Sequence, residues 1–293
     1  MTFYEIEFPL AALSSEAVEA ALFEAGASSI TFVDRGDEPV LEPKPGEVRL
    51  WSDTLVRALF QESSDAALNL DRLSSALGPH ITQTARVRAV ADQVWERAWL
   101  TGWKSLRFGR RLWVCPRNAE APADPQAVVV RLDPGLAFGT GTHPTTALCL
   151  QILDSLPIVG QTVIDYGCGS GILGLAALKL GAAHVIAVDL DHQALLATRD
   201  NALRNGVAAN VTVQGIEASL PGAYCVMANI LSGPLIELAP KLTTACLPRG
   251  YLLLSGLLKT QAYAVKAAYA SGFDMVQVIE RDEWCCIYAR RVP

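Results

Sequence analysis

The sequence lacks the features of secreted, membrane and metal-binding proteins. Its N-terminus, MTFYEIEFPL, has no basic residue and no long apolar run, so it does not match a secretory signal. No apolar stretch approaches the length of a membrane span. The seven cysteines form no C-x-x-C pair, which leaves no indication of a zinc site or a redox couple. We therefore expect a cytoplasmic protein with reduced thiols, no bound metal and no membrane segment.

An excess of positive charge is also missing. The chain has 24 Lys and Arg against 30 Asp and Glu, a net charge of -6, so we expect no direct sequence-specific binding of nucleic acid. Apolar residues make up 51% of the chain and charged residues 18%, which is typical of a folded protein. A length of 293 residues favours two domains over one.

Residues 1–90 alternate between strand-like and helical segments in the order βαββαβ. The predicted strands are FYEIEFPL, SSITFVD, GEVRLW and HITQTARVRAV, and the predicted helices are SSEAVEAALFEAG and ALNLDRLSSALG. This order predicts a small α+β, ferredoxin-like sandwich with two helices on one face of its sheet. Because no catalytic group of residues stands out in it, we interpret this domain as a docking module.

Residues 91–104 are predicted to form a linker helix. Trp95, Trp99 and Trp103 recur every four residues and would form one stripe along it. Packing against a neighbouring domain is the expected role of this stripe, and substrate contact is the alternative. The spacing leaves open whether the joint is a mobile hinge.

Residues 105–293 are predicted to form the larger domain. From Val163 onward, strands and helices alternate, which predicts a doubly wound, Rossmann-like parallel sheet. The last segment, FDMVQVIERDEWCCIYARRV, predicts two strands joined by a turn at 281–283. An open α/β sheet that ends in such an antiparallel hairpin indicates a class I methyltransferase.

A glycine-rich loop follows the first predicted strand of this sheet. The stretch DYGCGSG places Asp165 before Gly167, Gly169 and Gly171, where glycines allow a ligand to approach the backbone at a helix N-terminus. When the motif is started at Gly169 instead of Gly167, Gly169, Gly171 and Gly174 also satisfy the G-x-G-x-x-G pattern of dinucleotide sites. A nicotinamide cofactor and S-adenosyl-L-methionine therefore compete for this loop.

Acidic residues at the strand ends favour S-adenosyl-L-methionine. Asp165 would repel a pyrophosphate but would suit the ammonium group of a methionine moiety. Asp189 ends the next strand, where its carboxylate could accept hydrogen bonds from both ribose hydroxyls. A turn or capping role is the alternative for each of the two. Asp191 is predicted to cap the following helix.

Asn229 is the candidate catalytic residue. It ends the fourth strand, in MANILSGPL, where its side-chain oxygen could accept hydrogens from an incoming amine. Methyltransferases of adenine or glutamine place [ND]-P-P-[YF] here, whereas this chain has Ile230 and Leu231. The absence of the aromatic residue favours a flexible alkyl amine over a planar target.

Three stretches carry a family resemblance: DPGLAFGTGTHPTT, VIDYGCGSGILGLAALKLGA and ANILSGPL. Together they resemble the bacterial ribosomal protein L-eleven (L11) methyltransferase family, over nearly the whole chain. The resemblance implies methylation of lysine side chains and of the N-terminal amine of L11, with S-adenosyl-L-methionine as cofactor. It also implies that the first loop folds over the cofactor and that the N-terminal domain recognises L11. The positions it places at the cofactor are Thr146, Gly167, Asp189 and Asn229.

Further cofactor contacts are expected from the first loop. Gly141 allows close approach, Thr142 offers a hydroxyl, and Phe138 could pack on the cofactor, with core packing as its alternative. His143 could be a base, or it could cap and pack, so the identity of any general base stays open. Two other functions also remain open, an NAD-dependent oxidoreductase and a non-catalytic assembly factor that binds the ribosomal protein.

Overall fold

The computed structural model describes residues 3–36, 50–61, 65–90, 104–120, 122–132 and 142–293. The chain divides into two compact units, Met1–Ala98 and Trp99–Pro293, and each is described by itself. The predicted linker helix with its tryptophan stripe lies outside the described residues, apart from Lys104. The predicted boundaries at 90 and 104 stay predictions.

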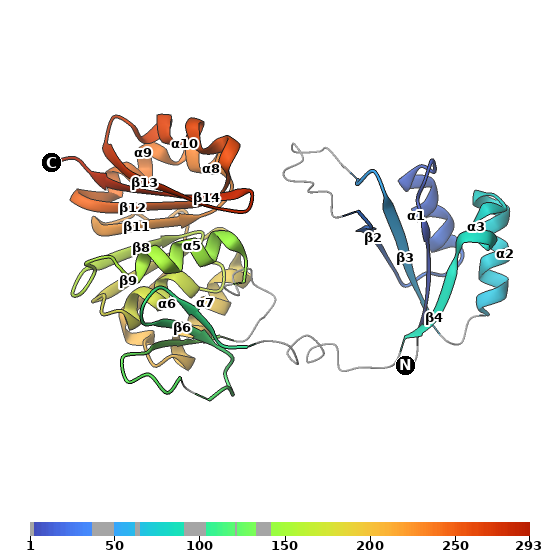
Figure 1. Cartoon of the computed structure of the whole chain (residues 1–293), viewed down its shortest axis with the longest axis horizontal. Coiled ribbons are helices and arrows are strands. Elements are labelled where there is room, and N and C mark those ends of the chain that lie inside the picture. Colours follow the sequence, from blue (N-terminus) through green and yellow to red (C-terminus); the bar gives the residue numbers. More distant parts are fainter. Residues whose placement is uncertain (1–2, 37–49, 62–64, 91–103, 121, 133–141) are drawn as a thin grey trace. The chain divides into compact units, whose positions relative to one another are not determined.

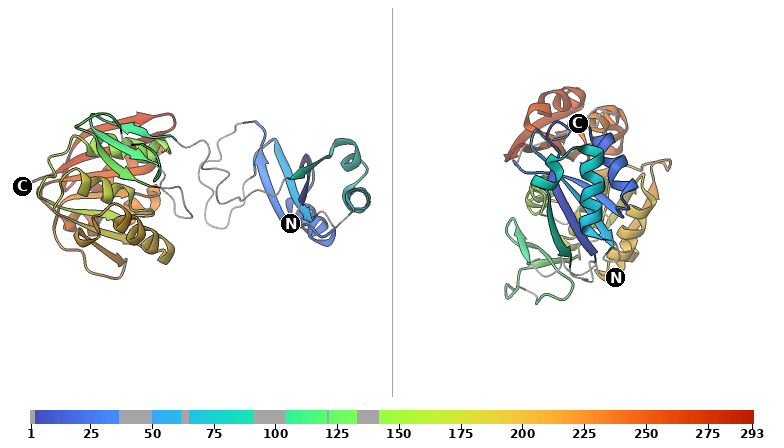
Figure 2. Two further views of the ribbon diagram at one scale, coloured as in Figure 1. Left: turned by 90° about the horizontal axis from the view of Figure 1, so that it is seen from below. Right: turned by 90° about the vertical axis from the view of Figure 1, so that its right-hand side faces the viewer.

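The N-terminal unit is a four-stranded antiparallel sheet with helices on one face (Figures 1 and 2). The strand order is β2-β3-β1-β4. The elements are β1 (Phe3–Pro9), α1 (Ser15–Glu24), β2 (Ser29–Asp34), β3 (Thr54–Gln61), α2 (Ala66–Leu77), α3 (His80–Thr84) and β4 (Arg86–Val90).

Alternation along β1 determines which face of this sheet is buried. Ile6 and Phe8 are fully buried beneath the helices, while Glu5 and Glu7 point to the opposite face. There the carboxylates pair with arginines of the neighbouring strands, Glu5 with Arg88 over 2.7 Å and Glu7 with Arg57 over 3.5 Å. The sheet therefore has one apolar face and one charged face.

The third strand of this unit is a correction to the sequence analysis. We predicted it over GEVRLW, but Leu50 and Trp51 lie outside any strand and the rest of that segment is not described. The strand is β3, Thr54–Gln61, whose Val56, Ala58 and Phe60 are fully buried. Leu55 and Leu59 lie on its other face, so apolar residues on both faces hide the two-residue period.

The fourth strand is shorter than predicted, because HITQTARVRAV does not form a single strand. His80–Thr84 form the helix α3, and only Arg86–Val90 extend as β4. Within α3, the hydroxyls of Thr82 and Thr84 donate to the carbonyls of Pro79 and His80. Burial of Ile81 in the core holds this turn, which outweighs the strand preference of its β-branched residues.

The C-terminal unit contains a seven-stranded sheet in the order β10-β9-β8-β11-β12-β14-β13 (Figure 1). The strands from β10 to β12 are parallel, and β14 and β13 run antiparallel. The strands are β8 (Thr162–Tyr166), β9 (His184–Asp189), β10 (Val211–Gly215), β11 (Ala223–Asn229), β12 (Cys246–Leu258), β13 (Phe273–Arg281) and β14 (Trp284–Arg291).

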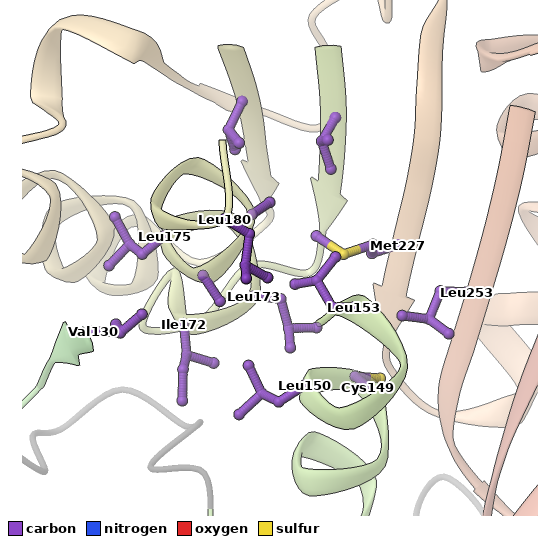
Figure 3. Close-up of a cluster of buried hydrophobic side chains, with 14 of the residues drawn as sticks. Val130, Cys149, Leu150, Leu153, Ile172, Leu173, Leu175, Leu180, Met227 and Leu253 are labelled. Carbon is purple, nitrogen blue, oxygen red and sulfur yellow. The ribbon is translucent and has the colours of Figure 1, made fainter. Parts of the chain in front are cut away.

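Two apolar layers cover the faces of this sheet. One contains α5 (Pro144–Leu153), α6 (Ile172–Lys179) and α7 (His192–Arg204), and Figure 3 shows side chains of α5 and α6 in one cluster with Met227 and Leu253 of the sheet. The other contains α8 (Ser232–Glu237), α9 (Ala239–Ala245) and α10 (Ala262–Tyr269). Short 3-10 turns lie at Ala208–Asn210 and Lys259–Gln261. Both faces of the parallel strands are therefore buried, as the doubly wound pattern predicts.

A smaller three-stranded sheet, β5 (Leu106–Phe108), β6 (Leu112–Cys115) and β7 (Val128–Arg131), packs beside α6. Asn205, directly after α7, joins β7 of this sheet to α7 by two hydrogen bonds. The Arg131 N–H donates to Asn205 Oδ1, and Asn205 Nδ2 donates to the Arg131 carbonyl, each over 2.8 Å. This side chain supplies the hydrogen bonds that another strand would make.

The pattern of PLIELAPKLTTACLPRG predicts a helix over the whole segment, but the helix ends before its last residues. Helix α9 ends at Ala245, and β12 begins at Cys246. Pro248 explains the difference, because a proline disfavours helical backbone at the residue before it.

Within the described residues, no helix is both long and apolar enough to cross a membrane. The same residues contain no group of three or more His, Cys, Asp or Glu side chains that could hold a metal ion.

Candidate functional site

A cavity of about 500 Å³ lies at the carboxyl ends of β8, β9 and β11. This is where open α/β sheets place their ligands, and the volume falls within the roughly 300–1,000 Å³ of small-molecule sites. The lining residues come from the strand ends, from the loop after β8, and from α5, α6 and α8. They are Thr146, Asp165, Tyr166, Gly167, Cys168, Gly169, Ile172, Leu173, Asp189, Leu190, Ile216, Asn229, Ile230, Leu231, Pro234, Glu237 and Leu238.

The glycine-rich loop after β8 forms one wall of the cavity. Gly167, Gly169 and Gly171 have φ angles of +74°, +54° and +79°, a region that side chains disfavour. Gly174, in α6, lies so close to β9 that an added Cβ would be 2.8 Å from Val185. Helix α6 thus starts directly against the sheet, with its N-terminus beside the cavity.

Asp165 is the next-to-last residue of β8 and is almost fully buried. Its Oδ2 accepts the Gly174 N–H over 2.8 Å, so it caps the first turn of α6. Burial raises the pKa of this carboxyl, the Gly174 hydrogen bond opposes the shift, and the nearby Asp189 adds to it, so that the pKa rises to about 7. The capping role considered in the sequence analysis is therefore present. Contact with a bound ammonium group stays a prediction.

Asp189 joins the end of β9 to the glycine-rich loop. Its Oδ2 accepts the Gly169 N–H over 2.9 Å, and its Oδ1 accepts the Asp191 N–H over 3.0 Å. An ionised carboxylate has about four acceptor positions, so both oxygens can still accept from a ligand hydroxyl. The prediction that Asp191 caps α7 is confirmed, since its side chain accepts the Gln193 N–H over 2.9 Å.

Asn229 and Thr146 meet at the inner end of the cavity. Asn229 Nδ2 donates to the Thr146 hydroxyl over 3.2 Å, which joins the end of β11 to the first turn of α5. Asn229 Oδ1 is buried and has no hydrogen-bond partner among the described residues. A buried polar atom without a partner costs free energy, so this oxygen is an acceptor available to a ligand N–H or O–H.

His143 caps α5, which bears out the capping alternative for this residue. Its Nδ1 lies 2.7 Å from the Thr145 hydroxyl, and its ring packs edge-on against Trp284 at 4.8 Å. Burial lowers the pKa of His143. Thr142 is exposed just before the cap, while Phe138 and Gly141 lie outside the described residues.

Part of the lining of the cavity was not predicted from the sequence. Ile216 directly follows β10, so the rule that strand ends surround the ligand could have identified it. Pro234, Glu237 and Leu238 reach the cavity only through the packing of α8 and the residue after it, for which the sequence gives no local signal.

The charges that line the cavity have one sign. Asp165, Asp189 and Glu237 carry carboxyl groups, and none of the described residues that line the cavity is a lysine or an arginine. Such a site favours cationic ligands over a diphosphate.

Comparison with known proteins identifies the family. Residues 2–292 match the family described as Ribosomal protein L11 methyltransferase (PrmA). The chain belongs to this family. Relatives of that name are 50% identical in Sodalis glossinidius, over 99% of this chain and 100% of theirs, and 50% identical in Vibrio cholerae, over 95% of each.

A solved structure also belongs to the ribosomal protein L11 methyltransferases. The ribosomal protein L11 methylase of Lactobacillus delbrueckii subsp. bulgaricus is 30% identical, with a TM-score of 0.59. The match covers 65% of this chain and 100% of that one. The predicted family is thus confirmed, and with it the assignment as a protein methyltransferase. Membership implies use of S-adenosyl-L-methionine, and it favours methyl transfer over the oxidoreductase and over the non-catalytic assembly factor.

Proposed function

We propose that this chain transfers methyl groups from S-adenosyl-L-methionine to the amines of ribosomal protein L11, at lysine side chains and at the N-terminus. The observation that carries this proposal is the buried, unpartnered Oδ1 of Asn229 beside a cavity lined by three carboxylates. The oxygen suits an amine N–H, and the carboxylates suit a cationic cofactor and a cationic substrate.

The residues that line the cavity fit S-adenosyl-L-methionine. We assign Asp189 to the ribose hydroxyls and Asp165 to the ammonium group, with Gly167 and Gly169 along the methionine moiety and Thr146 beside it. The free acceptor positions of Asp189 and the lack of a lining cation support this assignment. Thr142, Gly141 and Phe138 are assigned to the loop that covers the cofactor.

The chemistry is a direct displacement by an amine. S-adenosyl-L-methionine, when bound, supplies a methyl group made electrophilic by a sulfonium. Since the reference pKa of lysine is near 10.4, only about one amine in a thousand is neutral near pH 7.4, a cost of roughly 4 kcal/mol. The apolar wall around Ile230 and Leu231 desolvates the incoming ammonium and so lowers its pKa. Asn229 Oδ1 accepts an amine hydrogen and aims the lone pair.

The N-terminal unit is assigned to recognition of L11 as a ferredoxin-like docking module. Residues 1–98 contain 16 acidic and 8 basic side chains, whereas the rest of the chain contains 14 acidic and 16 basic ones. An acidic unit complements a partner protein with a basic surface. A ribosomal-protein substrate would place the enzyme in the cytoplasm.

Mass spectrometry of purified L11 after incubation with the chain and S-adenosyl-L-methionine tests the proposal. We expect one added methyl mass for each transfer, on lysine and N-terminal amines. If the chain binds the cofactor but the mass of L11 stays unchanged, methyl transfer is refuted. The remaining function is then the non-catalytic assembly factor. A rise in melting temperature with NAD but not with S-adenosyl-L-methionine would leave the oxidoreductase.

A further inference from the structure

The residue after Asn229 is enclosed by two glycines that are far from it in the sequence. Ile230 lies between Gly167, in the loop after β8, and Gly256, in β12. Its N–H donates to the Ser255 carbonyl over 3.1 Å, which continues the pairing of β11 with β12 by one residue. Ile230 therefore contacts both the glycine-rich loop and the strand beside Asn229.

The side chain of Ile230 occupies the space that any side chain at position 167 would need. A Cβ added to Gly167 would lie closer than 3.0 Å to Ile230 Cγ2, a separation that real Cβ atoms do not show. The glycine thus has a second role besides its φ of +74°: it leaves room for a branched side chain from another loop. A shift of this loop would therefore press on Ile230 or release it.

The backbone of Ile230 rests on Gly256 in the same way. A Cβ at position 256 would lie 2.8 Å from both Ile230 N and Ile230 C, and closer still to its carbonyl oxygen. These are backbone atoms, which cannot rotate away as a side-chain tip can. Gly256 also has a φ of +84° and lies where the pairing of β12 with β14 shifts between Leu254 and Leu257. This bulge brings β12 against the peptide that follows Asn229.

We propose that Ile230 is a positioning residue that couples the glycine-rich loop to the amine acceptor Asn229. Its side chain packs against Gly167 and its backbone packs against Gly256. Ile230 thereby determines where Asn229 Oδ1 lies relative to a ligand on the glycine-rich loop. The inference rests on the proposed function, since it assigns Gly167 to the cofactor and Asn229 to the amine. It adds Gly256, which is absent from the residues that line the cavity, as a second positioning residue.

A double-mutant cycle between positions 167 and 230 tests the coupling, with cofactor affinity measured by calorimetry and kcat measured on L11. Gly167→Ala should weaken S-adenosyl-L-methionine binding about 10-fold in the native and Ile230→Val backgrounds, which both keep the γ2 methyl. In the Ile230→Ala background, which removes that methyl, Gly167→Ala should weaken S-adenosyl-L-methionine binding about 3-fold or less. An equal loss of cofactor affinity on Gly167→Ala in all three backgrounds would overturn the coupling.

Gly256→Ala tests the contact between Gly256 and the backbone of Ile230. We expect kcat to fall at least about 10-fold while cofactor affinity stays within about 3-fold, because the change displaces Asn229 and leaves Asp189 in place. Gly233→Ala is the matched control, since its Cβ would meet nothing within 4 Å. Proportional losses of melting temperature, cofactor affinity and kcat would show that Gly256 serves only the fold, and would overturn its positioning role.

Should Gly256→Ala fail to fold, Ile230→Ala alone addresses the same point, with the same expected split between kcat and affinity. These outcomes are separable from failure of the proposed function. A wild-type chain that methylates no L11 would refute the function. A wild-type chain that methylates L11 but shows no coupling between positions 167 and 230 would refute only the inference.

Discussion

The side-chain amide of Asn229 donates to the hydroxyl of Thr146, 83 residues earlier in the chain, over 3.2 Å. This bond fixes the rotation of the Asn229 amide, because it commits the nitrogen to α5. The side-chain oxygen of this cavity-lining residue is left buried and without a partner among the described residues. In the proposed reaction, this acceptor is preorganised before the amine arrives.

Asn229→Ala should lower kcat about 10- to 100-fold, since it removes a hydrogen bond to a group that becomes charged. Cofactor affinity should change much less. Steady-state kinetics on L11 and calorimetry with S-adenosyl-L-methionine measure the two effects separately. Thr146→Val should produce a smaller loss of the same kind, and Thr146→Ser, which keeps the hydroxyl, should resemble the wild type. Equal losses of kcat and affinity in Asn229→Ala would contradict the assignment.

Asp189→Ala should have the reverse effect, weakening cofactor binding about 10- to 100-fold with a smaller change in kcat. The variant loses the predicted ribose acceptor and also the bond that holds the Gly169 N–H. Asp191→Ala is the matched control, because it removes a neighbouring carboxylate that caps α7. That control should cost about 1 kcal/mol of stability and leave cofactor affinity unchanged.

Stability should depend on pH through Asp165. Burial raises its pKa to about 7 from an ordinary 3.8, so the folded protein binds an extra proton between these values. Its contribution to stability is therefore fully present below about pH 4 and is lost as the pH rises through about 7. Relative to Asp165→Asn, the wild type should lose about 1 kcal/mol of unfolding free energy per pH unit in this window. Urea unfolding at several pH values measures the slope, and parallel curves would contradict the shift.

Asn205→Ala should destabilise the C-terminal unit by about 2–3 kcal/mol, because it leaves the N–H and carbonyl of Arg131 without their partner. Urea unfolding compares this variant with Asn210→Ala, which removes one exposed hydrogen bond to the Ala183 carbonyl. The control should cost less than about 1 kcal/mol. Similar costs for the two variants would show that Asn205 does not hold the small sheet in place.

Local patterns were enough to predict much of the fold. The alternation of strands and helices from Val163 onward follows from apolar runs separated by glycines and turn residues, and β8, α6, β9 and α7 form in that order. Where apolar residues lie on both faces, as in β3, or where β-branched residues lie in a buried turn, as in α3, the local pattern failed. Burial in the N-terminal core decided both segments.

The sequence by itself determined that Asp165, Asp189 and Asn229 lie at the carboxyl ends of strands, because strand and helix periods are local. Parallel strands place these ends on one edge of the sheet. Tertiary structure alone decided which side chains meet there: Thr146 with Asn229, Glu237 at the cavity, and Ile230 between Gly167 and Gly256. These contacts join segments far apart in the chain. They depend on sheet order, on one bulge in β12 and on the close packing of side chains, and none of these has a local period that a sequence can display.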